Sequence, residues 1–178
     1  DQGPTADLRT LPTGRQIFGK IPFDIQPGSN SIIVLKSSYR PPGSDTPEEV
    51  IIPLGYPVEG LAFLHSSAYA GRGNIALYQI LYEDGKTIDI PLICKMNMFD
   101  WTDIELRSLQ NDQTTESEIA WQGSCPMFKS INLLLMRGAN PYPETPVKAV
   151  RFAIADGEAV PILIGLTGVL LGLAGGYG

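Results

Sequence analysis

The sequence predicts an all-β domain of antiparallel strands, and three observations support this. The segment Ile75–Leu92 holds two apolar runs around Asp84-Gly85, and an Asp-Gly pair between strand-like runs is a strong β-hairpin signal. Short apolar runs recur along the whole chain, and 19 glycines and 15 prolines supply turns between them. Only Asp103–Gln110 has a helical pattern. Many short strands with few helices indicate a β-sandwich or barrel.

The expected strands follow from runs of branched and aromatic residues bounded by turn formers. In chain order they are Gln16–Phe18, Phe23–Ile25, Ser31–Leu35, Glu49–Leu54, Val58–His65, Ile75–Tyr82, Thr87–Ile93, Glu118–Trp121, Ile131–Met136, Val147–Ile154 and Pro161–Leu166.

The patterns of individual strands also predict their positions. Thr87–Ile93 and Val147–Ile154 alternate in polarity or size, as expected of strands with two different faces. Ile75–Tyr82 is apolar on both faces, so we expect it inside a sheet. Between the hairpin arms we expect a type I′ turn, which needs positive φ at both Asp84 and Gly85.

The two ends of the chain receive different interpretations. Because the chain begins at Asp1 rather than Met, we expect a processed or excised piece, with residues 1–10 as a loose lead-in. The apolar run 159–174 is shorter than the about 20 residues of a membrane span, and Pro161 and Gly165 interrupt it. We interpret it as a closing core strand with a trailing extension at 168–178; a membrane anchor is the alternative.

Length and charge narrow the class of protein. The 178 residues and 43% hydrophobic content fit one globular domain, residues 1–178, with a substantial core. The net charge is −6, and the lysines and arginines are scattered rather than clustered. A nucleic-acid surface needs clustered basic side chains, so we expect no nucleic acid as partner. The short, interrupted apolar run 159–174 leads us to expect no membrane partner either.

The two cysteines, Cys94 and Cys125, leave two alternatives open. In an extracellular chain they would form a disulfide that closes a loop of about 30 residues. Otherwise they are buried free thiols, which are common in cores. Their spacing matches neither a CxxC motif nor a metal site.

The single histidine, His65, excludes a site with several histidine ligands. It follows the strand-like LAFL and precedes Ser66 and Ser67. We consider three roles for it: a local hydrogen bond at a strand end, a ligand contact at the sandwich rim, or the base of a Ser-His-Asp triad.

The acidic residues Asp100, Asp103 and Glu105 surround Trp101 in a long polar loop. Paired carboxylates perform glycoside hydrolysis, but solvated acids are ordinary in such loops. Loop carboxylates also bind calcium, so a structural calcium ion is an open alternative, without an Asp-x-Asp-x-Asp-Gly motif to support it. We expect no other cofactor.

Aromatic residues in loops suggest a sugar-binding surface, which needs flat apolar faces beside polar groups. Trp101 and Trp121 are the tryptophans, and Tyr69 precedes Arg72 and Asn74. For each tryptophan, packing in the core or at its rim is the alternative.

Seven segments follow one another in the order LPTGRQIFGKIPFDI, VIIPLGYPVEGLAFLHSSAYAG, ALYQILYEDGKTIDIPL, FDWTD, AWQG, NPYPETPVKAVRFAIADG and PILIGLTG. Taken together, they resemble the galactose-binding-domain-like β-sandwiches, the jelly-roll accessory domains of large secreted polysaccharide-active enzymes. The resemblance covers roughly residues 8–167. It implies a two-sheet antiparallel jelly roll with a non-catalytic role. One departure is the sequence MRGANP, where similar chains have an aromatic residue before the Asn-Pro loop. Arg137 and Asn140 are polar contacts available there instead.

Three hypotheses follow. The first is a carbohydrate-binding module, secreted or at the cell surface, that binds a poly- or oligosaccharide and belongs to a larger glycan-active protein. The second is a structural domain that packs against neighbouring domains. The third is a free-standing glycosidase or lyase; we expect no catalysis by this chain alone. The expected ligand-binding residues are His65, Tyr69, Arg72, Asp100, Trp101, Trp121 and Asn140. An exposed Trp101 and Tyr69 on one surface would favour the first hypothesis, and a broad exposed apolar patch the second.

Overall fold

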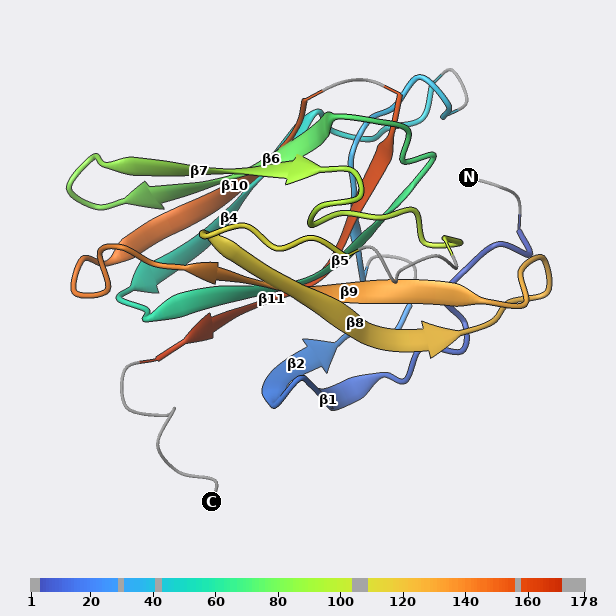
Figure 1. Cartoon of the computed structure of the whole chain (residues 1–178), viewed down its shortest axis with the longest axis horizontal. Coiled ribbons are helices and arrows are strands. Elements are labelled where there is room, and N and C mark those ends of the chain that lie inside the picture. Colours follow the sequence, from blue (N-terminus) through green and yellow to red (C-terminus); the bar gives the residue numbers. More distant parts are fainter. Residues whose placement is uncertain (1–3, 29–30, 41–42, 104–108, 156–157, 171–178) are drawn as a thin grey trace.

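The computed structural model describes residues 4–28, 31–40, 43–103, 109–155 and 158–170, and within these it contains strands and no helix (Figure 1). Each of the expected strands is confirmed, most with small changes at the ends. The strands are β1 (Gly14–Phe18), β2 (Ile21–Ile25), β3 (Ile33–Val34), β4 (Glu49–Tyr56), β5 (Gly60–Ala68), β6 (Asn74–Tyr82), β7 (Thr87–Ile93), β8 (Thr115–Gly123), β9 (Ile131–Ala139), β10 (Val147–Ile154) and β11 (Val160–Val169).

The strands form three antiparallel sheets arranged in layers. One sheet has four strands in the order β4-β10-β6-β7, and another has five in the order β3-β11-β5-β9-β8. The third is the β1–β2 hairpin. In Figure 1 the five-stranded sheet lies between the four-stranded sheet above and the hairpin below. The expected antiparallel all-β class is confirmed.

The main core fills the space between the two large sheets. Phe63 of β5 stacks on Tyr78 of β6 with ring centroids 4.0 Å apart, and Phe152 of β10 packs on the same tyrosine at 4.9 Å. All three side chains are buried. Burial of such large rings removes much apolar surface from water and supplies a major part of the stability.

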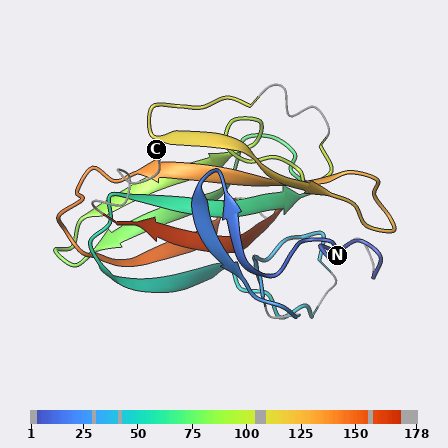
Figure 2. The same ribbon diagram turned by 90° about the horizontal axis from the view of Figure 1, so that it is seen from below.

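The opposite face of the five-stranded sheet is covered as well. Residues alternate along β5, so Ala62 and Leu64 point away from the main core. They pack with Phe18 and Phe23 of the β1–β2 hairpin, which lies across this sheet in Figure 2. The five-stranded sheet is therefore buried on both faces, which explains why β5 is apolar through most of its length.

The β6–β7 hairpin and the interior position of β6 are confirmed, but the expected turn type is wrong. Gly85 has a φ of 86°, whereas Asp84 is not in the left-handed region. The Gly85 N–H donates to the Tyr82 carbonyl at 3.1 Å, and the Tyr82 N–H donates to the Lys86 carbonyl at 3.0 Å. The loop therefore has three residues and needs only one left-handed residue, unlike a type I′ turn.

The expected closing strand is also confirmed, because β11 lies between β3 and β5 in the five-stranded sheet. No helix within the described residues is long and apolar enough to cross a membrane. Asp103, Leu109 and Gln110, the ends of the expected helix, are not helical. The rest of that helix, 104–108, and most of the expected trailing extension, 171–178, lie outside the described residues.

Candidate functional site

His65 is sealed inside the protein rather than placed at the rim. Its ring lies between the large sheets, with no exposed surface. Its Nε2 donates to the Asn97 carbonyl at 3.1 Å, because a carbonyl only accepts, and its Nδ1 accepts from the Tyr78 hydroxyl at 3.0 Å. Burial lowers the pKa of His65 to about 4, against the weaker opposing effect of the bond to Asn97, so the ring is neutral at physiological pH.

These bonds also leave His65 without a serine partner. The Ser67 hydroxyl donates to the Val160 carbonyl at 3.1 Å, and the Ser66 hydroxyl lies 3.4 Å from the Phe99 carbonyl. Since both ring nitrogens of His65 are occupied elsewhere, the arrangement is not that of a Ser-His-Asp triad, whose base must contact the nucleophile. The expected strand-end or rim position of His65 is wrong because β5 continues three residues further, to Ala68.

Asp100 and Asn140 hold loops in place. Asp100 accepts from the backbone and hydroxyl of Thr102 at 2.9 and 2.6 Å and from the Ala70 N–H at 3.2 Å. Asn140 is buried; its amide donates to the Val58 carbonyl at 2.6 Å and accepts from the Tyr82 hydroxyl at 2.5 Å. The Asp100–Thr102 bonds are local, whereas the bonds of Asp100 to Ala70 and of Asn140 to Val58 and Tyr82 join segments that are distant along the chain. Their polar atoms are engaged within the protein.

The expectation of an exposed Trp101 is wrong. Only 6% of this residue is exposed, and its ring packs edge-on against Phe128 with centroids 5.6 Å apart. Trp121 is half-buried and packs against the same hydrophobic cluster as Phe128, whose buried members include Trp101 and Ile131. Trp101 nevertheless has one unusual property: its indole Nε1 is buried and has no hydrogen-bond partner. Buried donors are almost always paired, so this one needs an explanation.

Tyr69 lies at the end of β5 beside an aromatic residue that sequence reasoning missed. Its ring stacks on Tyr39, with centroids 4.5 Å apart and planes 17° from parallel. Tyr69 is half-buried and has a φ of 53°, while Tyr39 is 54% exposed. Arg72, also expected in the site, is exposed three residues after Tyr69. The only sequence signal for Tyr39 was an aromatic residue within the long polar loop 36–47.

A cavity of about 490 Å³ lies on the outer side of the five-stranded sheet. Its floor comes from β5, β9 and β11, and its outer wall comes from the segment 4–13, here called the N-terminal strap. Apolar side chains form most of the lining, and Trp101 is the expected site residue that reaches it. The lining includes Leu8, Leu11, Ile25, Ile32, Val34, Ala68, Trp101, Leu133, Val160, Ile162 and Ile164.

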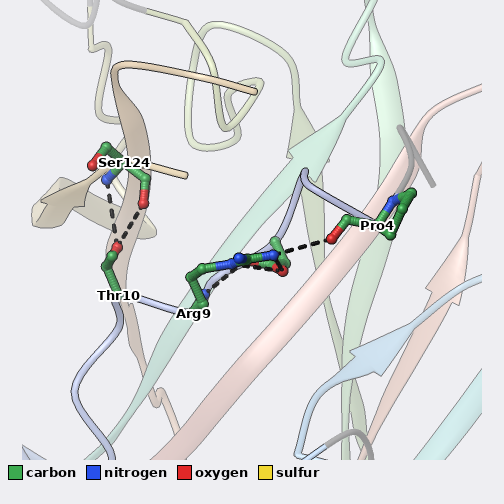
Figure 3. Close-up of polar contacts among 5 residues, drawn as sticks. Pro4, Arg9, Thr10 and Ser124 are labelled. Atoms are coloured by element: carbon green, nitrogen blue, oxygen red, sulfur yellow. Dashed lines mark hydrogen bonds and ion pairs between the residues drawn. The ribbon is translucent and has the colours of Figure 1, made fainter. Parts of the chain in front are cut away.

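In the strap, expected as a loose lead-in over 1–10, Thr10 bonds to the rest of the domain, whereas the bonds of Arg9 lie within the strap (Figure 3). The Met127 N–H also donates to the Thr5 carbonyl at 3.3 Å. The Thr10 hydroxyl donates to the Ser124 carbonyl at 2.8 Å. The Arg9 guanidinium donates to both carboxylate oxygens of Asp7 and to the Pro4 carbonyl at 3.1 Å. Arg9 thereby lowers the pKa of Asp7. The Leu8 and Leu11 side chains of the strap pack against the five-stranded sheet.

The cysteines and acids assemble no further site among the described residues. Cys94 and Cys125 are both free, and the Cys94 thiol lies 3.2 Å from the Gly71 carbonyl, with its pKa raised by burial. Within the described part of the chain no three His, Cys, Asp or Glu side chains gather in a way that could hold a metal ion. Glu105, one of the expected acids, lies outside the described residues.

No family model, curated protein sequence or solved structure gives a significant match to this chain.

Proposed function

We propose that this chain is a non-catalytic, galactose-binding-domain-like jelly-roll domain that binds glycan through the surface formed by Tyr39 and Tyr69. It would serve as an accessory domain of a larger secreted or cell-surface glycan-active protein. The observation that carries the proposal is the parallel stack of these two rings, with more than half of Tyr39 exposed to solvent. The sequence resemblance to such domains points in the same direction.

The stack suits a sugar for a physical reason. Tyr69 covers one side of the Tyr39 ring and fixes its orientation, so little freedom is lost when a sugar ring packs on the exposed side. Sugar C–H groups contact an aromatic face, while hydroxyls require polar partners. Arg72 and Asn74, both exposed and shortly after Tyr69 in the chain, are the polar groups assigned to this role.

The bonding of the expected acid–base groups supports binding rather than catalysis. His65 is neutral, buried and bonded at both ring nitrogens. Both carboxylate oxygens of Asp100 accept hydrogen bonds that hold its loop. A general acid or base must instead reach the proton it transfers.

A glycan array followed by calorimetric titration of the best ligand tests the proposal. We expect dissociation constants between about 1 μM and 1 mM, because each sugar hydroxyl exchanges water bonds for protein bonds of similar strength. Tyr39→Ala should weaken binding at least about tenfold without changing the melting temperature by more than about two degrees. Tyr56→Ala, at another exposed tyrosine, is the matched control and should bind normally. Equal binding by the Tyr39 variant, or no binding at millimolar glycan, would contradict the proposal.

A second function, packing against a neighbouring domain, is supported by a different surface. The outer face of the four-stranded sheet carries Ile51, 50% exposed, next to Pro53 on the edge strand β4. A contiguous exposed apolar patch is typical of interaction surfaces, and Ile51 and Pro53 are the residues of this face that would contribute to one. If the chain binds no glycan, this function replaces the first.

A further inference from the structure

We infer that the outer face of the four-stranded sheet binds the same face of a second copy of this chain, which makes the protein a weak symmetric dimer. The second proposed function uses this face without naming a partner of known composition; here the partner is the chain itself. Glycan binding is not required for this interface.

The apolar side chains of this face are not used by the protein's own core. Successive residues of a strand point to opposite faces of the sheet, and Val50 and Ile52 of β4 pack into the main core. Ile51, Leu77 and Leu81 belong to none of the hydrophobic clusters formed by the described residues. Ile51 is 50% exposed, and both leucines are half-buried. A partner on this face would remove their apolar surface from water.

The polar side chains of the face are already bonded to one another. The Arg151 Nε donates to the Glu49 carboxylate at 2.7 Å, and the Gln79 amide donates to the Asp89 carboxylate at 2.8 Å. A polar or charged group that loses its water is costly unless it has a partner within the protein. These bonds therefore lower the cost of covering the face.

The strand register arranges the face in three rows, each with one residue from β4, β10, β6 and β7 in that order. The rows are Glu49–Ala153–Leu77–Pro91, Ile51–Arg151–Gln79–Asp89 and Pro53–Ala149–Leu81–Thr87. A second copy can lie face to face on these rows about a two-fold axis that runs either along the strands or across them.

An axis along the strands makes the face complementary to itself. It places β10 over the partner's β6 and β4 over the partner's β7, with each row over its own copy. Arg151 then lies over the partner's Gln79 and next to the partner's Asp89, so opposite charges meet. Leu77 and Leu81 each lie opposite an alanine of the partner's β10, and large residues opposite small ones let two faces interdigitate.

An axis across the strands gives a poorer fit. It places every strand over its own copy, so Arg151 faces the partner's Arg151, and the leucines of β6 face leucines. Like charges repel, and leucines that meet head-on hold the alanines apart. Charge and side-chain size therefore both favour the axis along the strands.

The size of the face sets the expected affinity. Four strands about 4.8 Å apart and five residues of about 3.4 Å each make a face of about 19 Å by 17 Å. This is smaller than the about 800 Å² per partner of a standard stable interface. We therefore expect a reversible dimer with a dissociation constant between about 10 μM and 1 mM.

Sedimentation velocity of the full chain between about 10 μM and 1 mM tests the inference, together with a charge placed at Ile51. Because Ile51 lies opposite the partner's Asp89, Ile51→Asp should weaken the dimer at least about tenfold. Ile51→Arg should stay within about threefold of wild type or bind more tightly. An axis across the strands reverses this order, because Ile51 is then next to the partner's Arg151.

Ile119, an isoleucine of β8 that is 40% exposed, provides the matched control. Ile119→Asp and Ile119→Arg make the same changes in net charge and should leave association within about twofold of wild type. Both isoleucines have exposed side chains, so we expect all four variants to fold, which their thermal melts will show.

Chemical crosslinking tests the register independently. Ile51→Cys and Asp89→Cys are made as separate variants and mixed, and a short bismaleimide reagent joins thiols that face each other. The mixture should give crosslinked dimers, whereas each variant alone should stay at the background that Cys94 and Cys125 give in the wild type.

Three results would overturn the inference: a monomer at about 1 mM, equal effects of Ile51→Asp and Ile51→Arg, or as much crosslinked dimer from Ile51→Cys alone as from the mixture. A monomer would leave this face to a neighbouring domain, as in the second proposed function. Tyr39→Ala should not change association, so failure of this interface remains distinguishable from failure of the glycan surface.

Discussion

At the scale of single residues, the chemically distinctive side chains of this protein serve mainly to hold it together. His65, Asp100 and Asn140 bond to groups of their own chain, and Trp101 is enclosed. The sequence places each of them near a turn or strand end, where binding residues concentrate. Their contacts join segments that are distant along the chain, as when His65 meets Asn97, and no local pattern predicts such contacts.

The depressed pKa of His65 makes stability depend on pH. The folded-state pKa of about 4 lies below the ordinary value of 6.5, so the unfolded chain binds a proton that the folded chain does not between these values. We therefore expect the free energy of unfolding to fall as the pH drops from about 6.5 to about 4, by up to about 3 kcal/mol from this group.

Urea denaturation at several pH values checks this prediction. His65→Gln, which cannot titrate, should show a flatter profile over the same window, although its absolute stability is lower. The pH range above about 4.5 is the informative one, because several carboxylates, including Asp84 and Asp112, lose their own stabilising contacts at lower pH. A wild-type profile no steeper than that of the variant would show that His65 does not resist protonation.

At the scale of elements, the sequence pattern was sufficient to predict which residues form strands, but not how the strands and loops pack against one another. The eleven expected strands are all present, because period-two alternation and turn residues are local signals. The β1–β2 hairpin illustrates the limit. Its two strands are predictable, yet its position across the five-stranded sheet depends on Phe18 and Phe23 packing on β5 and β9. The Tyr39–Tyr69 stack likewise joins two loops 30 residues apart, and either tyrosine alone carries little signal.

The β6–β7 turn provides an element-scale prediction. Gly85 has a φ of 86°, and a Cβ added there would meet no atom within 4 Å, so a substitution is penalised by backbone conformation alone. Gly85→Ala should lower the free energy of unfolding by about 1–2 kcal/mol. Gly71 also has open space but no left-handed φ, and Gly71→Ala should be neutral or slightly stabilising. Guanidinium denaturation of both variants measures the difference; equal stabilities would mean that the turn tolerates an L-residue.

At the scale of the whole molecule, the two large sheets differ in how they are covered. The five-stranded sheet has the main core on one face and the β1–β2 hairpin with the strap on the other. The outer face of the four-stranded sheet carries exposed residues such as Ile51 and Asp89. Residues 4–13 are therefore part of the structure that closes the domain, and they form one wall of its cavity.

This role of the strap can be tested with one charge placed at two positions. Leu11 is buried against the five-stranded sheet, whereas Thr13, two residues later, is exposed. Leu11→Asp should lower the free energy of unfolding by about 3 kcal/mol or more, because it removes a buried side chain and introduces an unpaired charge. Thr13→Asp adds the same charge in solvent and should stay within about 0.5 kcal/mol of wild type. Thermal melts and urea titrations of the two variants provide the comparison. If the strap were only a loose lead-in, both variants would have the same melting temperature and free energy of unfolding as the wild type. The strap would then not form the outer wall of the cavity.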